Sequence, residues 1–111
     1  MKSQHQVILS LGTNEGNRLQ NIENCIALIH QGIGTVIKVS KLYESPSWGF
    51  DSDAFYNCAL LIHTTSSASK ILTQVLKLEK KLGRVRGTDA GYQSRIIDID
   101  LIAFDEEIIK S

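Results

Sequence analysis

The segment "RIIDIDLIAF", residues 95–104, alternates between apolar and acidic side chains. Successive residues of a strand point to opposite faces, so Asp98 and Asp100 project together while Ile97 and Ile99 project to the other side. The two carboxylates are then about 6.5–7 Å apart and repel each other, and a divalent cation such as Mg²⁺ would offset that charge. A solvated edge strand gives the same alternation without any metal. The segment therefore predicts a strand with one buried face and one open face that carries a carboxylate pair.

The segments before this strand complete a regular order of strands and helices. Apolar residues recur at three- and four-residue steps in two stretches, which predicts two amphipathic helices. Runs rich in β-branched residues predict three further strands. The expected elements are a strand at 6–12, a helix at 19–32 (Leu19, Ile22, Ile26 and Ile29), a strand at 33–43, a loop at 44–53, a strand at 55–64, a helix over Ile71, Leu72, Val75, Leu78 and Leu82 after N-cap candidates Ser66, Ser67 and Ser69, and a strand at about 96–104.

This order predicts an α+β, ferredoxin-like βαββαβ fold. Both helices would pack on one face of a four-stranded antiparallel sheet and leave the other face open. The length of 111 residues fits one domain, residues 1–111, and 42% hydrophobic residues suffice for one modest core. We therefore expect a ligand site on the open face.

Composition limits the classes of partner. Twelve basic and twelve acidic residues cancel, so we expect no nucleic-acid partner and no attraction to an anionic membrane. The first residues read "MKSQHQVILSLG", and their apolar run is too short for a signal peptide or a membrane span. Cys25 and Cys58 each lie in an apolar segment, as core thiols do, so a reducing cytoplasm is the expected location.

Arginines are concentrated just before the carboxylate pair. Arg84, Arg86 and Arg95 bracket a loop that contains Gly and Tyr92. Guanidinium groups match phosphate oxygens bidentately, and such a loop could close over a polyphosphate. The same arginines would also suit a helix C-terminus and a solvated loop. Glu79, near the end of the second helix, is by default a solvent-facing residue.

Several stretches, taken in order, resemble one enzyme family. These are "VILSLGTNEGNR", "VSKLYESPSWGF", "FYNCAL", "LEKKLGRVR" and "SRIIDIDLIAF". They are similar to the 6-hydroxymethyl-7,8-dihydropterin pyrophosphokinases, which transfer the β,γ-pyrophosphate of ATP to a pterin alcohol in folate biosynthesis and release AMP. The resemblance extends over nearly the whole chain and implies the same ferredoxin-like fold.

The resemblance also implies roles for individual residues. Asp98 and Asp100 would bind two Mg²⁺ ions, and Arg84, Arg86 and Arg95 would join them as catalytic residues that hold the triphosphate. The implied ATP contacts are Glu79, Arg86, Tyr92, Arg95 and Leu101. On the pterin side, Asn57 would bind the ring edge and Phe55 would stack on the ring, with backbone groups near Ser45, Pro46 and Trp48 completing the pocket. Phe55 and Asn57 are two residues apart in a strand, so they should share a face.

Three features depart from the family pattern. The loop reads "YQSR" where the family has a Trp-Gly/Ala-Pro-Arg run, so Tyr92 takes the place of the loop tryptophan, and Leu76 stands where a polar nucleotide contact is expected. The family continues beyond the position of Ser111 with a segment that holds a His, an Arg and an aromatic residue. We therefore expect a domain that lacks this C-terminal segment and has impaired activity.

Two other classes share the predicted topology. RNA-recognition modules need exposed aromatic residues on the first and third strands, and neither "VILSLGT" nor the middle of "FYNCALLIH" has one. A small regulatory ligand-binding domain without catalysis is the better alternative, because it needs no metal pair. Metal-dependent nucleotide binding separates it from the kinase.

Overall fold

The computed structural model describes residues 4–13, 17–45, 55–82 and 97–108 of the chain. The elements in chain order are β1 (His5–Thr13), α1 (Arg18–Gly32), β2 (Thr35–Val39), β3 (Tyr43–Ser45), β4 (Phe55–Thr64), α2 (Ala68–Lys81), β5 (Asp98–Phe104) and β6 (Glu107–Ile108).

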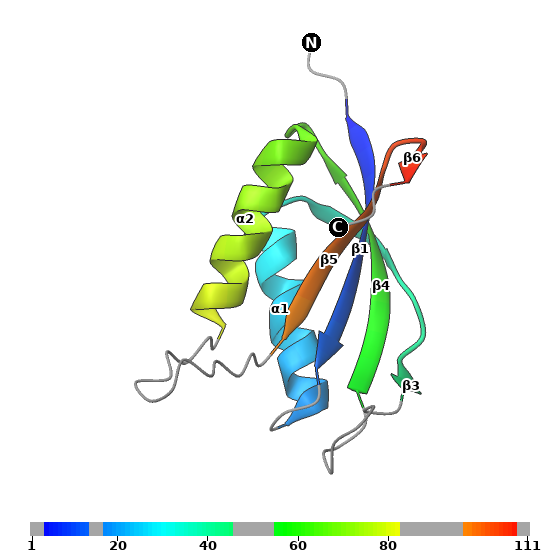
Figure 1. Cartoon of the computed structure of the whole chain (residues 1–111), viewed down its shortest axis with the longest axis vertical. Helices are drawn as coiled ribbons and strands as arrows, with labels where there is room; N and C mark the ends of the chain where they lie inside the picture. Colours follow the sequence, from blue (N-terminus) through cyan, green and yellow to red (C-terminus); the bar gives the residue numbers. More distant parts are fainter. Residues whose placement is uncertain (1–3, 14–16, 46–54, 83–96, 109–111) are drawn as a thin grey trace.

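The strands form one antiparallel sheet with the order β2-β4-β1-β5-β6, and β3 pairs with β4. Both helices lie on the same face of this sheet (Figure 1). The four long strands follow the order expected of a ferredoxin-like fold, so the predicted α+β class is confirmed. The short strands β3 and β6 add to the four that were predicted.

Polar side chains fix where each helix begins. The Asn17 side chain accepts a hydrogen bond from the Gln20 N–H at 3.1 Å at the start of α1. Ser67 accepts one from the Lys70 N–H at 3.3 Å at the start of α2. Each bond satisfies a backbone donor that has no partner within the helix. The predicted serine cap of the second helix is therefore confirmed.

The core fills the space between the helices and the sheet. Its members include alternate residues of the three central strands, and the inward faces of both helices cover them. Two leucines assigned to these faces are outside the core, because Leu19 is 50% exposed and Leu72 is 38% exposed. Cys25, which is fully buried, lies on the inward face of α1 instead.

The predicted second strand, residues 33–43, is interrupted. β2 ends at Val39 and β3 begins at Tyr43, and the register with β4 already shifts between Val36 and Lys38. Ser40 still holds the intervening chain to β4: its N–H donates to the Ala59 carbonyl and its side chain accepts from the Ala59 N–H, both at 2.8 Å. The continuous run of β-branched residues concealed this irregularity.

Within the described residues, neither helix is both long enough and apolar enough to cross a membrane.

The two cysteines give a test of the core packing. Cys25 and Cys58 are buried free thiols, and burial raises the pKa of Cys25 to about 12 and also raises the pKa of Cys58. Because the thiolate is the reactive form, both should react with iodoacetamide at least about 100-fold more slowly in the native protein at pH 8 than in concentrated urea. Mass spectrometry of quenched samples measures this. Fast native labelling of either residue would contradict the packing.

The same pKa shift predicts how stability depends on pH. The folded state holds the Cys25 proton more tightly than the unfolded state, where the thiol has its ordinary pKa of 9.0. The free energy of unfolding should therefore fall as the pH rises from about 9 toward about 12. Urea titrations of the parent and of Cys25→Ser should show a steeper loss in the parent over this range.

Candidate active site

The carboxylate pair lies on the open face of the sheet. Along β5, Ile97, Ile99 and Leu101 are 2%, 5% and 1% exposed and face the helices. Asp98 and Asp100 alternate with them and project to the other side, Asp98 partly buried and Asp100 exposed. The alternation expected from the sequence is present. Leu101, a predicted ATP contact, has its side chain in the core, on the opposite side of β5 from the carboxylates.

Gly12 separates the carboxylates from the predicted pterin residues. In the strand register Gly12 is paired with Asp98 on β5 and with Asn57 on β4. Directly paired residues share a face, so the three form a row across the central strands. Because neighbouring strands are about 4.8 Å apart, the Asp98 and Asn57 backbones are separated by roughly 10 Å. Gly12 leaves the middle of this row without a side chain.

The space above Gly12 is bounded on the β4 side. A Cβ atom at Gly12 would lie 3.1 Å from Asn57 Oδ1 and 3.8 Å from a ring carbon of Phe55. Both side chains therefore approach Gly12 from β4, as expected for two residues on one face. The glycine was predicted only as the end of the first strand. Gly12 follows Ser10 by two residues in β1, so the two-residue alternation already indicated that Gly12 lies on the open face with Ser10.

Asn57 is oriented by β3. Its Nδ2 donates a hydrogen bond to Ser45 Oγ at 2.8 Å and a longer one to the Phe55 carbonyl at 3.4 Å. Ser45 is paired with Phe55 in the β3–β4 ladder, and Tyr43 is paired with Asn57. The structure thus brings Ser45, Phe55 and Asn57 together at one end of the open face. The amide oxygen is directed toward Gly12.

Glu79 is buried, so its default assignment as a solvent-facing residue is wrong. The side chain is 9% exposed, and Oε2 accepts a hydrogen bond from the Ile99 N–H at 2.8 Å. Ile99 lies between Asp98 and Asp100 in the sequence. The bond therefore ties α2 to the part of β5 that presents the carboxylate pair. The helical period already placed Glu79 on the buried face, four residues after Val75.

Replacing Glu79 tests this tie. Glu79→Ala should lower the free energy of unfolding by about 1–3 kcal/mol, because the Ile99 N–H would lose its acceptor in a buried setting. Glu79→Gln keeps an acceptor oxygen and should cost less. Urea denaturation of the three proteins measures both differences. An equal loss in the two variants would show that the negative charge, and not the hydrogen bond, stabilises the fold.

Six predicted site residues lie outside the described residues. They are Pro46, Trp48, Arg84, Arg86, Tyr92 and Arg95, and their roles remain predictions. The chain leaves α2 at Leu82 and returns at Ile97, and these two residues line one small pocket of about 50 Å³ together with Asn21 and Asn24. Leu82 and Ile97, the described residues on either side of 83–96, therefore lie near each other at the start of β5, one residue before Asp98.

The fold and the open face define a ferredoxin-like α+β domain. On its open face, a glycine lies between a carboxylate pair on one side and an oriented amide on the other. The family model for 7,8-dihydro-6-hydroxymethylpterin-pyrophosphokinase (HPPK) matches residues 8–110. The chain belongs to this family, and the resemblance drawn from the sequence is confirmed.

Curated relatives agree with the family match. The chain is 39% identical over 107 residues to the folic acid synthesis protein fol1 of Pneumocystis carinii, covering 95% of this chain and 14% of that protein. It is 32% identical over 109 residues to the 2-amino-4-hydroxy-6-hydroxymethyldihydropteridine pyrophosphokinase of Helicobacter pylori, covering 96% and 66% respectively. The enzyme of the same name from Bacillus subtilis is 33% identical over 105 residues, covering 93% and 62%. The chain thus spans less than two thirds of the length of each of these relatives.

Proposed function

We propose that this chain transfers the pyrophosphoryl group of ATP to the hydroxymethyl group of 6-hydroxymethyl-7,8-dihydropterin in folate biosynthesis and releases AMP. The observation that carries the proposal is the strand register, which pairs Gly12 with both Asp98 and Asn57. It puts an acidic group and a hydrogen-bonding amide on one face with an open position between them. Membership of the pyrophosphokinase family favours this activity over a regulatory ligand-binding domain.

The carboxylate pair fits a magnesium-dependent reaction. Among the described residues, no group of three or more His, Cys, Asp or Glu side chains could hold a metal ion. Two carboxylates on one strand face are nevertheless the donor set that Mg²⁺ takes when substrate phosphates and water supply the remaining ligands. Asp98 and Asp100 would hold the metal, with two ions proposed. When bound, Mg²⁺ would neutralise phosphate charge and lower the pKa of the substrate hydroxyl.

The protein itself would mainly position the two substrates. Asn57 would bind the pterin edge through its amide, Phe55 would lie against the ring, and Gly12 would leave room for the substrate between them and the carboxylates. No nucleophilic side chain is required, because the pterin hydroxyl attacks the β-phosphorus and AMP is the leaving group. Holding the hydroxyl and the phosphorus in line accounts for much of the rate in such reactions.

The remaining predicted residues would complete the nucleotide site. Arg84, Arg86 and Arg95 would bind the triphosphate and stabilise the charge that develops on it. Tyr92 is proposed as a further ATP contact, as is Leu101 through its backbone, because the Leu101 side chain lies in the core. Pro46 and Trp48 are proposed as part of the pterin pocket. Glu79 already holds β5 through Ile99, so it would act as a positioning residue for the carboxylate pair as well as a nucleotide contact.

The proposed partners are ATP and the hydroxymethyl pterin, with no nucleic-acid or membrane partner. Cys25 and Cys58 are free buried thiols, which favours the reducing cytoplasm as the place of action.

A direct assay of both reaction products tests the proposal. The 111-residue chain is incubated with ATP, Mg²⁺ and 6-hydroxymethyl-7,8-dihydropterin, and AMP and the pterin diphosphate are quantified by chromatography. Equal amounts of both products are expected, and none without the pterin. Calorimetry with a nonhydrolysable ATP analogue, with and without Mg²⁺, measures nucleotide binding independently of turnover. Metal-independent binding, or ADP in place of AMP, would contradict the proposal.

A further inference from the structure

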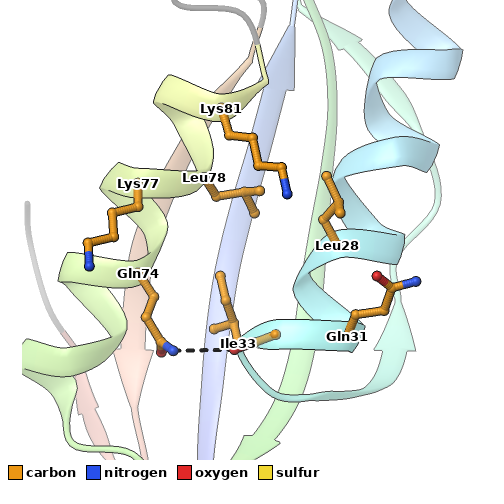
Figure 2. Close-up of a pocket in the computed structure, with 8 residues that line it drawn as sticks. Leu28, Gln31, Ile33, Gln74, Lys77, Leu78 and Lys81 are labelled. Atoms are coloured by element: carbon orange, nitrogen blue, oxygen red, sulfur yellow. Dashed lines mark hydrogen bonds between the residues drawn. The ribbon is translucent and has the colours of Figure 1, made fainter.

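A pocket of about 320 Å³ opens between α1 and α2 (Figure 2). It lies in the helical layer, and both helices cover one face of the sheet (Figure 1). Asp98, Asp100 and Asn57 alternate with buried core residues along β5 and β4, so they project from the other face. The pocket is therefore separate from the candidate active site. We refer to it as the helix-layer pocket; its lining residues are Leu28, Gln31, Gly32, Ile33, Gln74, Lys77, Leu78 and Lys81.

The floor of the helix-layer pocket is apolar. Leu28 from α1, Ile33 just after α1 and Leu78 from α2 all border it, and Ile33 and Leu78 belong to the hydrophobic core. Sites for small molecules usually combine such a floor with a few directed polar groups, and their volumes begin at about 300 Å³. The pocket can therefore accept one aromatic ring system or a short branched chain.

Gln74 gives the pocket a directed polar atom. Its Nε2 donates a hydrogen bond to the Gly32 carbonyl at 3.2 Å, shown by the dashed line in Figure 2. This bond fixes the orientation of the amide, because the reversed amide would place two oxygens together. Oε1 is buried and has no hydrogen-bond partner among the described residues. Buried acceptors are rarely left unpaired, so we expect this atom to take a donor from a water molecule or from a ligand.

Lys81 supplies a positive charge at the edge of the helix-layer pocket. In Figure 2 its side chain extends from α2 toward α1, whereas that of Lys77 extends away from α1. None of the described residues that line the pocket is acidic. Residues seven apart on a helix are about 10.5 Å apart along its axis, so Lys81 and Gln74 stand at opposite ends of the apolar floor. A ligand that satisfies both must carry an anionic group at one end and a donor at the other.

We propose that the helix-layer pocket binds a small amphipathic carboxylate. The apolar body lies against Leu28, Ile33 and Leu78, the carboxylate pairs with Lys81, and an N–H or O–H at the far end donates to Gln74 Oε1. This is a second ligand site, distinct in both place and chemistry from the pterin and nucleotide sites.

An NMR titration of the ¹⁵N-labelled chain with indole-3-acetate tests the proposal, since this probe has the carboxylate, the ring and the N–H donor. Saturable shifts are expected for the Gln74 side-chain amide and for the backbone of Leu28 and Ile33, with a Kd on the order of 1 mM for a ligand of this size. Two matched probes remove one feature each: indole-3-acetamide lacks the charge, and 1-methylindole-3-acetate lacks the donor. Each should bind at least about fivefold more weakly.

Matched lysine variants localise the charge. Lys81→Met should weaken indole-3-acetate binding up to about fivefold, because Lys81 is exposed, and Lys77→Met should change it less than about 1.5-fold. Thermal unfolding of both variants checks the fold, and if Lys81→Met does not fold, the probe series on the parent decides. The proposal is overturned if no saturable shift occurs, if the three probes bind equally, if both lysine variants lose affinity equally, or if the shifts fall on the open face of the sheet.

Discussion

Asp98→Asn and Asp100→Asn are each expected to lower kcat/KM for AMP formation by about 10²–10³-fold or more. Each change keeps the shape of the side chain and removes one negative charge from the open face of β5. A neutral amide oxygen is a weaker ligand for Mg²⁺ than a carboxylate, so the phosphate charge would be less well neutralised in the transition state. Steady-state assays that vary one substrate while the other is saturating separate the effect on kcat from that on KM.

Binding measurements distinguish a metal role from a loss of fold. Calorimetry with a nonhydrolysable ATP analogue should show that Mg²⁺ strengthens binding to the parent and has little effect on either variant. Asp100 is exposed, so Asp100→Asn should leave the thermal midpoint unchanged or slightly raised, because one of two repelling charges is removed. Glu23→Gln, an exposed carboxylate on α1, is the matched control and should retain parental activity.

The double variant gives a sharper test. If Asp98 and Asp100 act on the same metal-bound phosphate group, removing the second carboxylate should add far less than the first, since the site is already lost. Additive losses would indicate that the two carboxylates act separately. Parental Mg²⁺-dependent binding in either single variant would show that the metal role is wrong.

Local sequence patterns were sufficient for the main elements of the fold. One face of each element packs in the core. The buried residues therefore recur at two-residue steps in β5 and at three- and four-residue steps in both helices, and the sequence shows these periods. The break between β2 and β3 gave no such signal. A register shift depends on how β2 and β4 fit together, and β-branched residues favour extended backbone on either side of a break. The hairpin to β6 turns at Asp105, whose φ is 55°, and sequence alone gave no reason to expect that turn.

The open face was predictable only in part. Alternation placed Asp98 with Asp100 and Phe55 with Asn57, but which strands lie side by side depends on the whole sheet. For that reason Gly12 was not recognised as the residue between the two groups. Glu79 was missed for a different reason. A carboxylate on a buried helix face has a large desolvation cost unless it accepts a hydrogen bond, and the donor here is a strand backbone N–H twenty residues away in the sequence. Only the folded structure shows that the Ile99 N–H fills this role.

Asn57→Ala is expected to weaken pterin binding by about 1–3 kcal/mol, which corresponds to roughly 5- to 150-fold in Kd. The amide is held by Ser45 at 2.8 Å, with its oxygen directed toward Gly12. It is therefore already oriented before a ligand arrives, and its loss would leave ring donors and acceptors unpaired. Affinity for the ATP analogue should remain nearly unchanged, because Asn57 and Asp98 are on opposite sides of β1. Fluorescence or calorimetric titrations with each ligand separately measure the two affinities.

Ser45→Ala separates orientation from contact. This change removes the hydroxyl that accepts from Asn57 Nδ2 but leaves the amide in place, so pterin binding should weaken by less than in Asn57→Ala. In the double variant, Ser45→Ala should cost almost nothing further, because its effect acts through an amide that is gone. Asn24→Ala, an exposed amide on α1, is the control for loss of an asparagine and should bind both ligands normally. If Asn57→Ala weakened both ligands equally, with a lower unfolding free energy, Asn57 would support the β3–β4 ladder and the pterin would bind elsewhere on the sheet.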